Sequence, residues 1–262
     1  MSTNTDSGTV RLQIEAGVAS ITFDRPQARN AMTWDMYQQL AAICTRLADD
    51  RSVRAVVFRG AGGQAFVAGT DIEQFTAFTS GEDGVAYERQ IEARVSQLCA
   101  LPMPTVALVE GWCVGGGLAI ATACDFRVAT PSARFGVPIA KTLGNCLSIQ
   151  NVARLRAAFG HQRTRRMLMM AELIGADEAL ACGYLHAVAE TDAINATAQA
   201  LVQQLVALAP VTQRVSKAAL DRLATHDLAN ADDLIRAAYG SADFHEGVAA
   251  FVAKRPPVWR GE

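Results

Sequence analysis

The stretch PTVALVEGWCVGGGLAIATACD, residues 104–125, constrains the fold more than any other part of the chain. Its apolar run Thr105–Val109 predicts a buried strand, and the alanine-rich residues after the three glycines at 115–117 predict a helix. Backbone N–H groups in the first turn of a helix have no partner within that helix, so a negative oxygen can bind there. The glycines let that oxygen come close to the backbone. A glycine triplet is also typical of a tight turn beneath a packed helix, and the triplet alone does not decide between the two.

A second junction of the same kind lies upstream in QAFVAGTDIEQF, residues 64–75. It follows a strand predicted over Ala55–Phe58 and leads through a turn of small residues to a helix predicted to begin at Asp71. Two such junctions can supply two N–H donors to one oxygen, which is how an oxyanion hole is built. Together the two stretches indicate a site for a substrate oxygen that gains negative charge.

Motifs along the chain add a family resemblance. AFVAGTDIEQF, GWCVGGG, CDFRVA and FGVP follow one another in the middle, with ITFDRPQARNAM near the start and GADEAL, GYLHAV and FHEGVAAFVAKRPPVW toward the end. In this order they resemble the crotonase superfamily of enoyl-CoA hydratases and isomerases. The resemblance covers nearly the whole chain and implies an α/β fold, a spiral of ββα units with a helical C-terminal region.

The resemblance also implies how the chain is organised and what it binds. It implies an acyl-CoA-binding core over residues 1–195 and a helical oligomerisation region over residues 196–262, which assembles the chain as a trimer or a dimer of trimers. The implied substrate is an acyl-CoA thioester, and coenzyme A is part of that substrate. No metal or redox cofactor is implied.

Residue-by-residue matching of the motifs places an oxyanion hole at the backbone N–H groups of Thr70 and Gly116. Two such donors stabilise the negative charge that develops on a thioester oxygen when an enolate forms. The resemblance further implies substrate contacts at Arg25, Ala28, Ala68, Asp71, Ile72, Gly115, Ile139 and Lys254. Arg25 and Lys254 would lie near the coenzyme, although each also fits a solvated surface charge, and Asp71 also fits a helix N-cap.

Two glutamates that hydratases of this family use for proton transfer are absent. The first follows the glycine triplet by two residues, where this chain has Ala119. The second follows the FGxP motif, where the chain has Ile139, or Ala140 if an insertion before Leu143 shifts the register. An alkyl group cannot transfer a proton, and each missing general acid or base contributes about 100- to 10,000-fold in rate. Efficient hydration by the usual mechanism is therefore not expected.

Several functions are compatible with a surviving oxyanion hole. The enolate can form without a strong protein base in the decarboxylation of a malonyl-type thioester, and a substituted base would permit isomerisation or hydrolysis. A non-catalytic acyl-CoA-binding protein is a candidate of a different kind. Turnover of any thioester would exclude that last candidate.

Substitutes for the absent glutamates can be sought near the two junctions. Glu73 is a candidate base, although it also fits a first-turn acid that the helix dipole favours. Lys141 is a candidate proton donor or carboxylate-binding group, and also fits a solvated lysine at a helix start. Cys146 would need a lowered pKa to act as a nucleophile, and we interpret it as a packed small residue.

Composition excludes some partners. The chain of 262 residues is 50% hydrophobic and has a formal net charge of −2, which gives no support to binding of nucleic acid or of an anionic membrane. Its six cysteines form no CxxC pair. With neither a secretory leader nor an apolar run long enough to span a bilayer, the sequence predicts a cytoplasmic protein with reduced thiols.

Local patterns predict the N-terminal elements. Val10–Ile14 and Val18–Phe23 alternate apolar and polar residues as in a β-hairpin. Thr33 is the predicted N-cap of a helix with an apolar face. Ser80–Gly84 is interpreted as a surface loop before a helix over Val85–Leu101.

The second half of the chain is predicted to be largely helical. Residues 142–170 carry arginines between apolar positions, which indicates helices with a solvated basic face. An RNA-binding role for this run is disfavoured because clustered aromatic residues are absent from it and the total charge is acidic. Over residues 193–253 the pattern predicts helices broken at Pro210 and near Gly240.

Overall fold

The chain begins with the predicted hairpin. A computed structural model describes residues 8–72, 75, 81–224, 242–243, 246, 250, 253 and 255–262. Strands β1 (Thr9–Glu15) and β2 (Val18–Asp24) pair antiparallel. Between them Gly17 turns the chain with a φ of 77°, a conformation that favours glycine. The alternation along β2 buries Ala19, Ile21 and Phe23 and leaves the intervening residues half-buried.

Two sheets form the centre of the molecule. The six-stranded sheet has the order β1-β2-β3-β5-β7-β10, and the four-stranded sheet has the order β4-β6-β8-β9. The further strands are β3 (Ala55–Gly60), β4 (Ala65–Ala68), β5 (Thr105–Val109), β6 (Trp112–Val114), β7 (Phe126–Ala129), β8 (Arg134–Gly136), β9 (Ile174–Gly175) and β10 (Ala187–Val188). Each of the pairs β3–β4, β5–β6 and β7–β8 contributes one strand to each sheet, and neighbouring pairs lie parallel.

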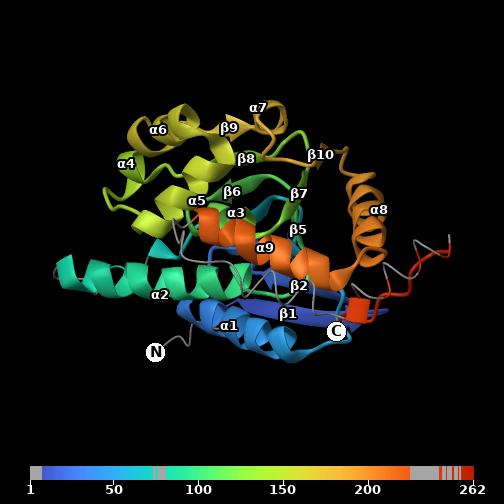
Figure 1. Ribbon diagram of the computed structural model, residues 1–262. Helices are drawn as coiled ribbons and strands as arrows, with labels where there is room; N and C mark the ends of the chain where they lie inside the picture. Colours follow the sequence, from blue (N-terminus) through green and yellow to red (C-terminus); the bar gives the residue numbers. More distant parts are fainter. Residues whose placement is uncertain are drawn as a thin grey trace.

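Helices follow the strand pairs and complete the spiral (Figure 1). They are α1 (Trp34–Asp49), α2 (Gly81–Cys99), α3 (Gly116–Ala123), α4 (Ile139–Thr142), α5 (Ile149–Phe159), α6 (His161–Met169), α7 (Ala176–Ala181), α8 (Ile194–Val206) and α9 (Pro210–Ala224), with a 3-10 turn η1 (Pro26–Ala28). Helix α2 follows β3–β4, α3 follows β5–β6, and α4 follows β7–β8. The predicted spiral of ββα units is therefore confirmed.

Two helix starts illustrate what local sequence could predict. The hydroxyl oxygen of Thr33 accepts a hydrogen bond from the Met36 N–H at 3.2 Å, which confirms the predicted N-cap of α1. Helix α2 begins at Gly81, so the loop predicted over Ser80–Gly84 is wrong for residues 81–84. Glu82 and Asp83 lie in the first turn of α2, where the helix dipole favours acidic residues. The helix predicted to begin at Asp71 falls mainly outside the described residues.

Helices α8 and α9 pack against the rest of this chain. Leu201 and Val202 of α8 join a hydrophobic cluster with Val106 and Val128 of the six-stranded sheet. From α9, the Lys217 ammonium donates to Asp125 at 2.8 Å. As predicted, α9 begins at Pro210, whereas the break predicted near Gly240 lies outside the described residues. Within the described residues, no helix is both long and apolar enough to cross a membrane.

The arginine-rich run differs from its prediction in two respects. Gly144, with a φ of 70°, follows α4, and the chain stays non-helical until Ser148 caps α5, so helices do not fill the run. Arg154 is buried and pairs with Glu92 of α2 at 2.8 Å, so the predicted solvated face is wrong for this residue. Arg163 and Arg166 do lie near the surface, and both pair with Glu178.

Candidate active site

The two predicted junctions meet in space. An ideal Cβ added to Gly115 would lie 3.5 Å from the Gly69 Cα, and one added to Gly116 would lie 3.2 Å from the Thr70 hydroxyl oxygen. Gly69 and Gly115 have φ values of 94° and 54°, which favour glycine at both turns. The turn after β4 and the start of α3 are therefore in direct contact.

Backbone hydrogen bonds hold both turns in place. The Met32 N–H donates to the Gly69 carbonyl, and the Asp71 N–H donates to the Met32 carbonyl, each at 2.9 Å. The Gly115 N–H donates to the Gly136 carbonyl at 3.0 Å. Because these bonds use the groups that flank Thr70 and Gly116, the turns are positioned without using the N–H groups of those two residues.

Close packing accounts for two glycines of the triplet. A Cβ on Gly116 would collide with the hydroxyl oxygen of Tyr37, and a Cβ on Gly117 would collide with the Val67 carbonyl oxygen. Helix α3 thus lies against β4 at a distance that only glycine permits. The glycine triplet can therefore be both a tight turn beneath a packed helix and a place where a substrate oxygen comes close to the backbone.

A cavity of about 180 Å³ opens at this junction. Its lining includes Thr70 and Gly116 together with four of the predicted substrate-binding residues, which are Ala68, Ile72, Gly115 and Ile139. Ala119 and Ile139 both line it, so alkyl groups occupy the positions at which the family resemblance places glutamates. We call this space the junction cavity.

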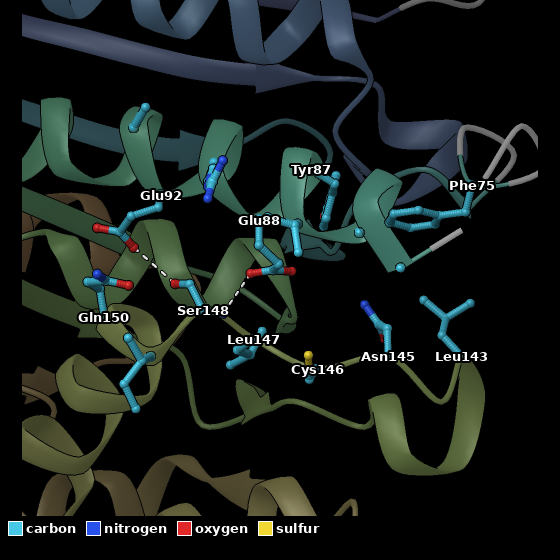
Figure 2. A pocket seen from close by; sticks show the side chains of 16 residues that line it. Phe75, Tyr87, Glu88, Glu92, Leu143, Asn145, Cys146, Leu147, Ser148 and Gln150 are labelled. Atoms are coloured by element: carbon cyan, nitrogen blue, oxygen red, sulfur yellow. Dashed lines mark hydrogen bonds between the residues drawn. The ribbon is translucent and has the colours of Figure 1, made fainter. Parts of the chain in front are cut away.

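A larger cavity of about 850 Å³ adjoins the junction cavity between α2 and the segment 143–150 (Figure 2). We call it the outer cavity. The residues that line both cavities are Phe75, Tyr87, Glu88, Leu143, Asn145 and Leu147. These shared walls make the outer cavity a continuation of the junction cavity.

Two tyrosines that the sequence did not single out hold the side chain of Thr70. Its hydroxyl oxygen lies 2.9 Å from that of Tyr37 in α1 and 3.0 Å from that of Tyr87 in α2. Burial raises the pKa of Tyr37, and burial raises the pKa of Tyr87 to about 12, so both phenols are neutral. The network ties the Thr70 turn to two helices and so stabilises one side of the site.

An ion pair supports the same turn from behind. Arg25 donates to the Asp71 carboxylate at 2.6 Å and to the Ala31 carbonyl at 3.2 Å. The Arg25 side chain is only 11% exposed. Ala28, in η1, is half-buried close by in the chain. Asp71 thus pairs with a neighbouring arginine, and the predicted coenzyme contacts of Arg25 and Ala28 stay predictions.

The remaining predicted residues lie at different places. Lys141 is exposed on α4 and is not among the described residues that line the junction cavity. The interpretation of Cys146 as a packed residue is wrong, because the non-helical segment 144–148 places it, exposed, at the wall of the outer cavity rather than in the core. Glu73 and Lys254 lie outside the described residues.

Helix α2 brings two further carboxylates to the cavities. Glu88 lines both, and its Oε2 accepts a hydrogen bond from the Ser148 N–H at 2.7 Å. Glu92 lines the outer cavity and pairs with Arg154. Burial favours a higher pKa for Glu92, but hydrogen bonds from Arg154, Ser96 and Ser148 lower it overall. The spacing of the two glutamates is helical, yet periodicity alone does not reveal which side of a helix faces a cavity.

Comparison with known proteins identifies the family. A sequence model of the enoyl-CoA hydratase/isomerase family matches residues 13–262. This chain belongs to that family. Mitochondrial enoyl-CoA hydratase domain-containing protein 2 of Bos taurus is 34% identical over 254 residues, which cover 94% of this chain and 85% of the relative. The short-chain-enoyl-CoA hydratase of Clostridium acetobutylicum is 32% identical over 250 residues, which cover 94% of this chain and 95% of the relative.

Solved structures of the same family share the fold. An enoyl-CoA hydratase/carnithine racemase from Magnetospirillum magneticum superposes with a TM-score of 0.87 at 34% identity, covering 97% of this chain and 96% of the other. An enoyl-CoA hydratase from Mycobacterium smegmatis superposes with a TM-score of 0.86 at 30% identity, covering 95% and 98%. The chain is thus an acyl-CoA enzyme of the crotonase superfamily, as its motifs predict.

Proposed function

We propose that this family member binds the thioester oxygen of an acyl-CoA between the backbone N–H groups of Thr70 and Gly116. The observation that carries the proposal is the contact between their two turns at the wall of a cavity. An enolate oxygen held there would accept two preorganised hydrogen bonds, and the loss of one such donor typically costs about 3 kcal/mol of barrier. The enzyme would therefore stabilise a thioester enolate.

The apolar residues of the junction cavity limit the reaction. Ala119 and Ile139 cannot exchange protons with a substrate, so the enzyme would not hydrate an enoyl thioester by a two-glutamate route. A reaction that needs one proton-transfer group, or none, is favoured.

Assembly and location complete the proposal. We expect a homo-oligomer, either a trimer or a dimer of trimers, with residues 196–262 contributing to its contacts and residues 1–195 forming the acyl-CoA-binding core. The six free cysteines support a location in a reducing compartment. We expect that compartment to be the cytoplasm, although relatives such as the Bos taurus protein are mitochondrial. No metal or redox cofactor is part of the proposed reaction.

Crotonyl-CoA tests the proposal directly. We expect the purified protein to bind it in calorimetry while the absorbance of its conjugated double bond stays nearly constant. The absorbance should stay nearly constant because two acid–base groups are absent, and each such group contributes about 100- to 10,000-fold to the rate of hydration. Free coenzyme A serves as the control ligand. Rapid loss of absorbance would contradict the claim about hydration, and failure to bind any acyl-CoA would contradict the proposed function itself.

The outer cavity predicts a preference for longer acyl chains. Each methylene buried there contributes up to about 0.8 kcal/mol, so octanoyl-CoA should bind at least about tenfold more tightly than butanoyl-CoA. Ala93 lines the outer cavity, and A93F should weaken octanoyl-CoA binding while sparing butanoyl-CoA. A86F is the matched control, because Ala86 is an exposed residue of the same helix. Equal affinities for the two thioesters would contradict this use of the cavity.

A further inference from the structure

The proposed oxyanion hole has a carboxylate in its own cavity. Glu88 of α2 lines the junction cavity together with Thr70, Gly116 and Ala119. It comes from a different helix than the positions at which the family resemblance places glutamates. A group suited to proton transfer is thus present although those two positions carry Ala119 and Ile139.

The geometry of Glu88 leaves one of its oxygens available to a substrate. Figure 2 shows its side chain extending from α2 toward Ser148, whose N–H donates to Oε2 at 2.7 Å. Oε1 has no hydrogen-bond partner among the described residues. The preceding residue, Tyr87, reaches the Thr70 hydroxyl at 3.0 Å, so this turn of α2 lies beside one wall of the proposed oxyanion hole.

The surroundings of Glu88 raise the pKa of its carboxyl group above the value in water. Burial raises its pKa, the Ser148 N–H lowers it, and the charge of Glu92 raises it, with a net increase above the ordinary value of 4.5. The other groups that face it do not reverse this. Tyr37 and Tyr87 are neutral phenols, and the charge of Arg154 is shared with Glu92. A rise in the pKa of a carboxyl group toward the pH at which it works makes it a more effective proton-transfer group.

We propose that Glu88 is the general acid–base group that moves a proton to and from the acyl chain bound at Thr70 and Gly116. This rests on the proposed function. The Glu88 carboxylate accepts a proton from the carbon next to the thioester carbonyl. The C–H electron pair forms a carbon–carbon double bond, and the carbonyl π pair moves to the oxygen as the enolate. Glu88 then returns its proton to the same carbon or, when the substrate is a 3-enoyl thioester, to carbon 4, so that the double bond moves from carbons 3 and 4 to carbons 2 and 3.

Exchange of substrate hydrogen for deuterium tests this step and needs no co-reactant. Butanoyl-CoA in D2O should lose the hydrogens next to its carbonyl when the protein is added, as followed by NMR. E88Q should slow the exchange at least about 100-fold, the lower end of the contribution of a general base. Glutamine keeps an oxygen to accept the Ser148 N–H, so butanoyl-CoA affinity measured by calorimetry should stay unchanged.

Controls separate proton transfer from a structural role. E82Q makes the same change at an exposed residue of the first turn of α2 and should leave the exchange rate unchanged. In the unmodified protein, exchange should fall as the pH drops through a midpoint above 4.5, since protonated Glu88 cannot accept a proton. This pH profile keeps the proposal testable if E88Q fails to fold.

The outcomes distinguish this proposal from the proposed function. If the unmodified protein binds no acyl-CoA, the proposed function fails and the role of Glu88 fails with it. If it binds butanoyl-CoA but catalyses no exchange, or if E88Q exchanges as fast as the unmodified protein, the role of Glu88 alone is overturned. A midpoint at or below 4.5 would also overturn it.

Discussion

Replacing Gly116 by alanine should lower the rate of thioester α-hydrogen exchange at least about 100-fold, the effect of losing one oxyanion donor. The added methyl group would collide with the Tyr37 hydroxyl and would lie 3.2 Å from the Thr70 hydroxyl. The Tyr37 phenol can shift to relieve that collision, which disturbs its hydrogen bond to Thr70, and the close contact with Thr70 displaces the start of α3 from the Thr70 turn. The two N–H groups would then no longer converge on one oxygen. The exchange of butanoyl-CoA hydrogens in D2O measures the loss.

A matched glycine provides the control for this change. A Cβ added to Gly175 meets no atom within 4 Å, and the residue has an ordinary φ of −79°. G175A should therefore leave the exchange rate unchanged. G116A should remain folded, because the phenol of Tyr37 is the end of a side chain that can shift. Normal exchange by folded G116A would contradict the role of its N–H group.

The neighbouring substitution, G117A, should act on stability. The added methyl group would collide with the Val67 carbonyl oxygen and lie 2.8 Å from the Val67 carbonyl carbon and Cβ. All of these atoms belong to the buried strand β4, so the strand and α3 must separate. We expect the free energy of unfolding to fall by about 3 kcal/mol, the upper end of the usual range for overpacking. Urea denaturation measures this loss as a lower midpoint with an unchanged slope.

The same control applies to G117A with a different measurement. G175A should change the free energy of unfolding by less than about 0.5 kcal/mol, as is usual for a surface substitution. A similarly small change for G117A would show that α3 can move away from β4 without loss of stability. That result would contradict the claim that close helix–strand packing requires this glycine.

Local patterns in the sequence determined the elements and the family. The hairpin, the Thr33 cap and the strand before the glycine triplet depend on residues close in the chain, through alternation, capping and turn preferences. The motifs around Thr70 and Gly116 predicted that two distant turns would meet, and they do. The alkyl side chains at the two glutamate positions could likewise be read from the sequence.

Tertiary packing alone decided which other side chains reach the site. Helical spacing placed Glu88 on α2 but did not show that this side of the helix faces a cavity shared with Gly116. Likewise, Tyr37 and Tyr87 converge on Thr70 only because α1 and α2 pack together around its turn. The sequence pattern around Arg154 is typical of a solvated charge, and its pairing with Glu92 depends on where α2 lies. Periodicity reflects neighbours along the chain, whereas burial and contact depend on the positions of segments far apart in it.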